Sequence, residues 1–326
     1  MTALAWSDPA RVATVRARET AAVLIGVVAL AGCAERAVAP PPSPPLDVDR
    51  PGAAIPGDLD VAIRLDLTGA RRILGVDLGA ALALDITDRD DEKTSKLVHD
   101  ALSRADTAWI AFRPGLSPAA TDNVLLVRGE FADLEPHGEG SDWSTPVDLG
   151  GAMRVYQRHA PKRRSAPARI YARSEDWFVF VSTAEVDAAE RSIEKRAGDE
   201  HVDPPDHGIV SVSARTRPLV RLLAPNYPAV AEALEDANSL EGSAAADERG
   251  LSVDLSARFT TEPEAARARD RTKLLQSVLS HAKGPFATLA QGASIDAVAT
   301  NLVVRIRLDA KGFASILGCF QGSGGC

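Results

Sequence analysis

Leu251-Ser252-Val253-Asp254-Leu255-Ser256-Ala257-Arg258-Phe259 alternates strictly between apolar and polar residues. Successive side chains of a strand point to opposite faces of a sheet, so this pattern predicts a strand with one face on a core and the other toward solvent. The same alternation recurs at 61–67 and 300–308. One-sided strands are typical of antiparallel sheets, because a parallel sheet between two helix layers needs both faces apolar.

Other stretches add strands and helices around these three. Strands are expected at 107–113, 123–131, 153–158, 169–173, 177–182, 209–215 and 239–246, and helices around 73–74, 97–102, 184–197, 219–223, 229–237 and 262–283. Two of the helices begin with the spacing of a capping box, Ser182 with Glu185 and Thr261 with Glu264. The chain is therefore expected to have an α+β fold of mainly antiparallel sheets with helices on one face.

Residues 199–208 interrupt every periodic pattern and are expected to form a linker. A first half, 58–198, precedes them, and a second half, 209–326, follows. Each half begins with a strand, two helical pieces and two further strands. This shared order indicates either two diverged repeats of one half or a coincidence that any α+β chain can offer.

The N-terminal part carries the most specific motif. An apolar run from Ala21 leads into Leu30-Ala31-Gly32-Cys33, and it is shorter than the roughly 20 residues that span a bilayer. The motif resembles the lipobox of bacterial lipoproteins, and the chain is similar to predicted lipoproteins of unknown function from high-GC Gram-negative bacteria. The alternatives are an ordinary secretory signal and a short hydrophobic anchor.

The lipobox resemblance implies that residues 1–32 are a signal peptide and that Cys33 carries the lipid. The residue after it is Ala34, not the aspartate that retains many such lipoproteins in the inner membrane. The implied location is the outer membrane, lipid-anchored and facing the periplasm. Residues 33–57 would then be a tether, and its run Pro40 to Pro45 favours extended polyproline II.

Two further cysteines, Cys319 and Cys326, lie in a glycine-rich tail. In an exported protein they are expected to form a disulfide, the alternative being two free thiols.

The chain has 326 residues, of which 45% are hydrophobic and 25% charged, and its net charge at pH 7 is −8. This composition is that of a folded body, and its acidic balance argues against a nucleic-acid partner.

Few residue patterns indicate chemistry. The best metal candidate is the linker, where His201, Asp203, Asp206 and His207 lie within seven residues. The acidic run 85–92 is a weaker candidate, for calcium. The alternative for both stretches is that their polar residues simply belong to a solvated linker and a solvated helix end. Phosphate-binding loops, dinucleotide fingerprints and nucleophile elbows are absent from the sequence.

The sequence therefore predicts an envelope lipoprotein that is not an enzyme and uses no cofactor. Its expected partners are membrane lipid, through acylated Cys33, and either an envelope protein or a small ligand. Two alternatives stay open: an envelope hydrolase with an irregular site, and a metal-binding protein that uses His201 to His207.

Overall fold

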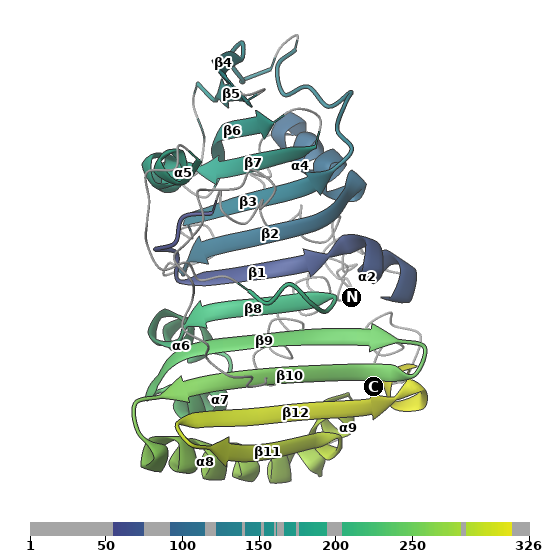
Figure 1. The fold of residues 1–326 in the computed structure, drawn as a ribbon, viewed down its shortest axis with the longest axis vertical. Coiled ribbons are helices and arrows are strands. Elements are labelled where there is room, and N and C mark those ends of the chain that lie inside the picture. Colours follow the sequence, from purple (N-terminus) through teal and green to yellow (C-terminus); the bar gives the residue numbers. More distant parts are fainter. Residues whose placement is uncertain are drawn as a thin grey trace, which may run out of the picture.

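The computed structural model describes residues 55–74, 92–114, 122–138, 141–150, 153–159, 161, 166–173, 176–193, 204–281 and 285–314. Over these residues the strands form one antiparallel sheet of 12 strands in the order β11-β12-β10-β9-β8-β1-β2-β3-β7-β6-β5-β4 (Figure 1). The expected α+β class with an antiparallel sheet is confirmed.

The first half supplies seven strands of this sheet. Its elements are β1 (Val61–Asp66), α2 (Leu67–Leu74), α4 (Glu92–Arg104), β2 (Ala105–Arg113), β3 (Asp122–Gly129), β4 (Val147–Gly150), β5 (Met153–Gln157), β6 (Pro167–Arg173), β7 (Trp177–Ser182), the 3₁₀ turn η3 (Thr183–Glu185) and α5 (Val186–Ile193).

The second half supplies the other five strands. Its elements are β8 (Val210–Arg215), α6 (Thr216–Leu223), α7 (Pro228–Leu234), β9 (Ala237–Asp247), β10 (Gly250–Phe259), α8 (Glu262–Ser280), α9 (Pro285–Gln291), β11 (Ala293–Val298) and β12 (Asn301–Asp309).

The two halves meet strand to strand at β1 and β8, in the middle of the sheet (Figure 1). These strands pair antiparallel, with Ile63 opposite Val212 and Leu65 opposite Val210. One hydrophobic core continues across this junction, because both pairs are buried in the same cluster. The halves therefore share a core and do not face each other across a cleft.

The two faces of the sheet are covered differently. The large core lies on one face, under helices of both halves, and includes Leu102 of α4, Leu219 of α6 and Leu289 of α9. A second, smaller core lies on the opposite face of the first half, and Ala189 of α5 belongs to it. The expected placement of all helices on one face therefore does not extend to α5.

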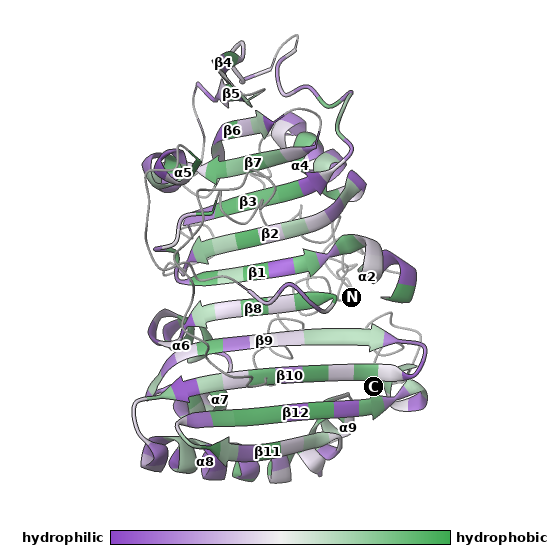
Figure 2. Ribbon diagram, in the orientation of Figure 1, coloured by the Kyte–Doolittle hydropathy of each residue, from purple (hydrophilic) through white to green (hydrophobic). Residues whose placement is uncertain are grey.

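On that opposite face the second half is polar. Ser252, Asp254 and Ser256 alternate along β10 with buried Val253 and Leu255. Figure 2 shows this mixture as purple and white bands on the green strands. As the alternation of 251–259 predicts, the apolar residues of this strand face the core under the helices and the polar residues face the other side.

The capping box expected at Ser182 does not form. The Ser182 hydroxyl accepts a hydrogen bond from the backbone N–H of Asn123 at 2.9 Å, and Glu185 pairs with Arg113. Hydrogen-bond partners from distant parts of the chain have replaced the local capping contacts of these two side chains. At α8, by contrast, the Glu264 carboxylate accepts from the backbone N–H of Thr261 at 3.0 Å, as the spacing predicts.

Candidate functional site

Helix α8 rests on the sheet through small side chains. Over its 19 residues the buried ones are Ala265, Ala268 and Thr272. Small residues let the first half of the helix approach β10 and β12 closely, but they bury little apolar area, and burial is what stabilises a docked helix.

Polar side chains hold α8 to the helices and strands on either side. The side-chain amide of Gln276 donates to the carbonyl oxygens of Ala290 in α9, at 2.9 Å, and of Ala293 in β11, at 2.7 Å. On the other side, Arg271 donates to the carbonyl oxygen of Glu232 in α7 at 2.9 Å. The position of α8 therefore depends strongly on hydrogen bonds along its edges.

The large apolar residues of α8 are in its second half and are incompletely buried. Leu274 is 69% exposed and Val278, one turn later, is 64% exposed. Leu275 and Leu279 are half-buried, and Phe286 of α9 is 36% exposed. These five residues are called the apolar α8 surface below. Scattered exposed apolar residues are ordinary, but a contiguous group on one helix and its neighbour is typical of an interaction site.

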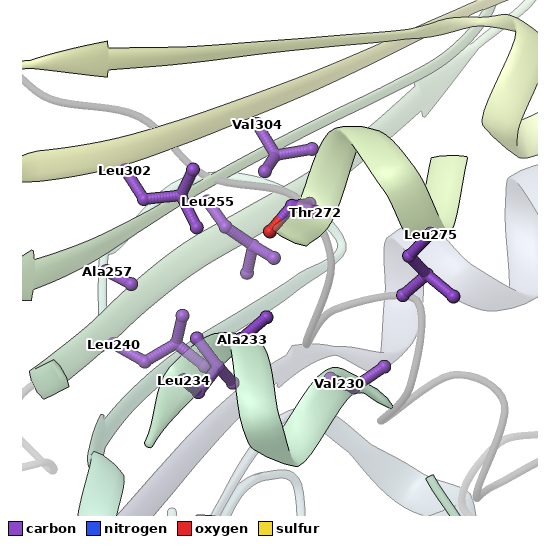
Figure 3. Close-up of a pocket in the computed structure, with 10 residues that line it drawn as sticks. All are labelled: Val230, Ala233, Leu234, Leu240, Leu255, Ala257, Thr272, Leu275, Leu302 and Val304. Carbon is purple, nitrogen blue, oxygen red and sulfur yellow. The ribbon is translucent and has the colours of Figure 1, made fainter. Parts of the chain in front are cut away.

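Two apolar cavities flank α8, and Leu275, Leu279 and Phe286 of this surface are among their lining residues, whereas Leu274 and Val278 line neither. One, of about 20 Å³, lies between α7, α8 and the sheet, and Leu275, Val230 and Leu234 are among its lining residues (Figure 3). The other, of about 40 Å³, lies between α8, α9 and the sheet, and its lining includes Leu275, Leu279 and Phe286. Thr272, Leu275 and Val304 line both cavities.

Cavities of this size have room for about one to three water molecules. Their lining is almost wholly apolar, so water gains few hydrogen bonds there. A methyl-bearing side chain from a bound partner would fill the cavities with a lower free energy than water does. The site is therefore suited to bind apolar groups.

The proposed metal ligands of the linker are only partly described. Asp206 and His207 are within the described residues, and their Oδ1 and Nδ1 atoms lie 3.9 Å apart. His201 and Asp203 lie outside them, as do Cys33, Cys319, Cys326 and residues 85–91 of the acidic run, whose last residue, Glu92, begins α4. Among the described residues no group of three or more His, Cys, Asp or Glu side chains is placed to hold a metal ion.

Three of the described histidines make polar contacts in different parts of the structure. His137 Nδ1 lies 2.9 Å from the carbonyl oxygen of Trp143, and His281 Nδ1 lies 2.7 Å from that of Ser277. His207 Nε2 lies 3.1 Å from the hydroxyl of Ser243. That last contact joins the linker to β9, and sequence spacing gave no sign of it.

Most tryptophan and tyrosine side chains within the described residues are buried. Trp143, Tyr156, Tyr171 and Trp177 are all buried. Trp109 is half-buried. These residues therefore act mainly as packing partners in the described part of the chain.

Comparisons with known proteins give a loose likeness in fold. No protein-family model and no curated protein matches the chain. Crystal form I of TP0453 is similar with a TM-score of 0.44 and 14% identity, over 85% of this chain and 99% of that chain. Crystal form III of TP0453 has a TM-score of 0.41 and 13% identity, over 83% and 98%. A likeness at these TM-scores assigns no function.

Within the described residues, no helix is both long enough and apolar enough to cross a membrane.

Proposed function

We propose that this chain is a lipid-anchored envelope protein whose folded body binds a partner through the apolar α8 surface. The observation that carries the binding role is the exposure of Leu274 and Val278 on a helix whose other large apolar residues, Leu275 and Leu279, line apolar cavities. Leaving these side chains in water costs free energy that a bound partner would recover.

The anchor in this proposal is Cys33, acylated at the lipobox. Each buried acyl methylene contributes about 0.8 kcal/mol, and more than one chain gives persistent anchoring. Ala34 supports the outer membrane as the location, with the body on the periplasmic side. In this proposal the Cys33→Ser variant leaves the membrane fraction, and its retention there would contradict the anchor.

The size of the cavities favours a protein partner over a small ligand. At about 20 and 40 Å³ they are too small for a whole ligand, whose pockets are on the order of 300 Å³ or more. They suit single side chains that project from a partner surface. The occupant proposed is therefore an envelope protein that presents an apolar helix or strand edge.

The finer fold proposal is that the two halves are diverged repeats. Outward from the junction the sheet order is β1-β2-β3-β7-β6 in one direction and β8-β9-β10-β12-β11 in the other. Both series consist of three consecutive strands and then a hairpin whose second strand pairs with the third. This agreement supports duplication, with α8 and α9 in the second half occupying the place in the chain order that β4 and β5 have in the first.

The binding role is tested with a double variant, Leu274→Asp with Val278→Asp. The matched control is Lys273→Asp with Ser277→Asp, which adds two carboxylates at exposed positions of the same helix. After mild detergent extraction, the first variant should migrate as the free protein and the control should keep the complex of the wild type. Identical migration of both variants and the wild type would contradict the proposal.

A further inference from the structure

The polar face of the sheet carries a row of hydrophilic side chains across the junction of the halves. Arg64 of β1 is directly opposite Ser211 of β8, and Ser211 is directly opposite Ser243 of β9. All three alternate with residues of the large core, so they project to the other face. Ser211 is fully buried, and Ser243 is 7% exposed.

The last residues of the linker, 204–208, cover this row. The carbonyl oxygen of Pro205 accepts a hydrogen bond from the Ser211 hydroxyl at 2.5 Å, and that of Gly208 accepts from Arg64 at 3.4 Å. Gly208 has a φ of +87°, and a Cβ there would lie 2.7 Å from the carbonyl oxygen of Ala244. Only glycine fits this turn. The linker is therefore held in one path over the face.

This path brings a histidine to a serine. His207 Nε2 lies 3.1 Å from Ser243 Oγ, and the Asp206 carboxylate lies 3.9 Å from His207 Nδ1. Asp206 is fully exposed and lies beyond hydrogen-bond distance of Nδ1, so it does not fix the tautomer of His207. In the tautomer with its proton on Nδ1, His207 Nε2 accepts the proton of Ser243. A hydroxyl within hydrogen-bond distance of an imidazole nitrogen is the pair that an activated serine nucleophile requires.

We propose that Ser243 is a nucleophile activated by His207, and that this pair cleaves esters with a small acyl group. Ser243 Oγ would attack the ester carbonyl carbon while its proton passes to His207 Nε2. The carbon–oxygen bond to the alcohol then breaks, and the alcohol leaves with that proton. A water molecule, deprotonated by His207, attacks the acyl-serine and releases the carboxylic acid, which restores the Ser243 hydroxyl.

The surroundings define the rest of the site. The His207 side chain is 70% exposed, so solvent and substrate reach the pair from the linker side. The small exposure of Ser243 limits the acyl group to a small one. The guanidinium of Arg64 lies on the same face two strands from Ser243, and its donation to the carbonyl oxygen of Gly208 helps to hold the linker over the pair. This activity is independent of the apolar α8 surface.

A fluorophosphonate probe tests the proposal on the purified full chain, because it bonds to an activated serine oxygen and releases fluoride. The expected result is one label per molecule, located by peptide mass analysis at Ser243. His207→Ala should slow labelling by about 10²-fold or more, the usual contribution of a general base. Hydrolysis of p-nitrophenyl acetate should fall in parallel.

Ser213→Ala is the matched control, since Ser213 lies on the same face in the neighbouring strand β8 and is 7% exposed, as Ser243 is. It should label at the wild-type rate. Identification of the labelled residue in the wild-type protein tests the proposal even where a variant loses stability. Absence of label from Ser243, or equal labelling of wild type and His207→Ala, would overturn the proposal and leave Ser243 as a residue that fixes the linker.

Discussion

The Nε–H group of Arg113 donates a hydrogen bond to Oε1 of Glu185 at 2.7 Å, although the Glu185 side chain is only 3% exposed. The same guanidinium donates to Asp58 at 2.5 Å. Burial opposes the charge of Arg113, but the hydrogen bonds to Glu185 and Asp58 outweigh it and raise the pKa of Arg113. These contacts join β2, the turn after β7 and the residues that lead into β1. They fix the point at which the proposed tether meets the body.

Glu185→Ala should destabilise the fold by about 2 kcal/mol, because it removes charge-assisted hydrogen bonds from a buried position. Glu185→Gln keeps a hydrogen-bond acceptor and the side-chain volume, so it should destabilise the fold less than Glu185→Ala. Chemical denaturation measures both. Equal midpoints for wild type and Glu185→Ala would show that Asp58 alone satisfies Arg113.

Leu275→Ala should lower the free energy of unfolding by only about 1 kcal/mol. The effect is small for a leucine substitution because Leu275 is half-buried and already lines two cavities. Leu255→Ala is the matched comparison, since Leu255 is 3% exposed and should lose about 3 kcal/mol. Thermal unfolding of both variants measures the difference. A larger loss for Leu275→Ala would mean that α8 is tightly packed and that its surface is not available to a partner.

Ala299→Gly should stabilise the protein. Ala299 joins β11 to β12 with a φ of 50°, a conformation that costs an alanine about 1 kcal/mol and a glycine much less. The melting temperature should rise by a few degrees. Ala297→Gly, two residues earlier within β11, should lower it, since glycine weakens a strand. A decrease in both variants would contradict the strained turn.

Stability should fall steeply in alkali because of Tyr156. Burial raises its pKa, and the carboxylate of Glu135 raises it further, which outweighs the opposing effect of Arg154. The folded protein therefore keeps the phenol proton where the unfolded chain loses it, near pH 10. This contribution to stability is complete below that pH and is lost as the pH rises above it.

Denaturation of wild type and Tyr156→Phe between pH 8 and 11, a range set by the ordinary tyrosine pKa of about 10, isolates this contribution. The variant should show the weaker dependence on pH. The same slope in both proteins would contradict a raised pKa for Tyr156.

The strands were predictable from sequence where one face is apolar and the other polar. The stretch 251–259 is the clearest case, because the large core lies on one side of it and solvent on the other. Strand β11 was missed although Ala293, Ile295 and Ala297 alternate with polar Ser294 and Asp296. Its turn contains Ala299 in place of the usual glycine or asparagine, so the ordinary hairpin signal was absent.

The candidate sites could not be predicted, because tertiary contacts create them. The apolar spacing of Leu274 and Val278 looks like an ordinary core stripe, and only the position of α8 leaves it exposed. His207 and Ser243 are 36 residues apart, and only the turn at Gly208 brings them together. In the same way, Glu185 has the spacing of a capping residue but pairs with Arg113.

The most direct test of the binding role is photo-cross-linking in intact cells from a benzophenone amino acid placed at position 278. Position 273, exposed on the same helix, serves as the control. One adduct of defined mass is expected from position 278, absent from position 273 and lost when Leu274→Asp is added. Adducts of equal yield from both positions, or none from position 278, would contradict a partner on the apolar α8 surface.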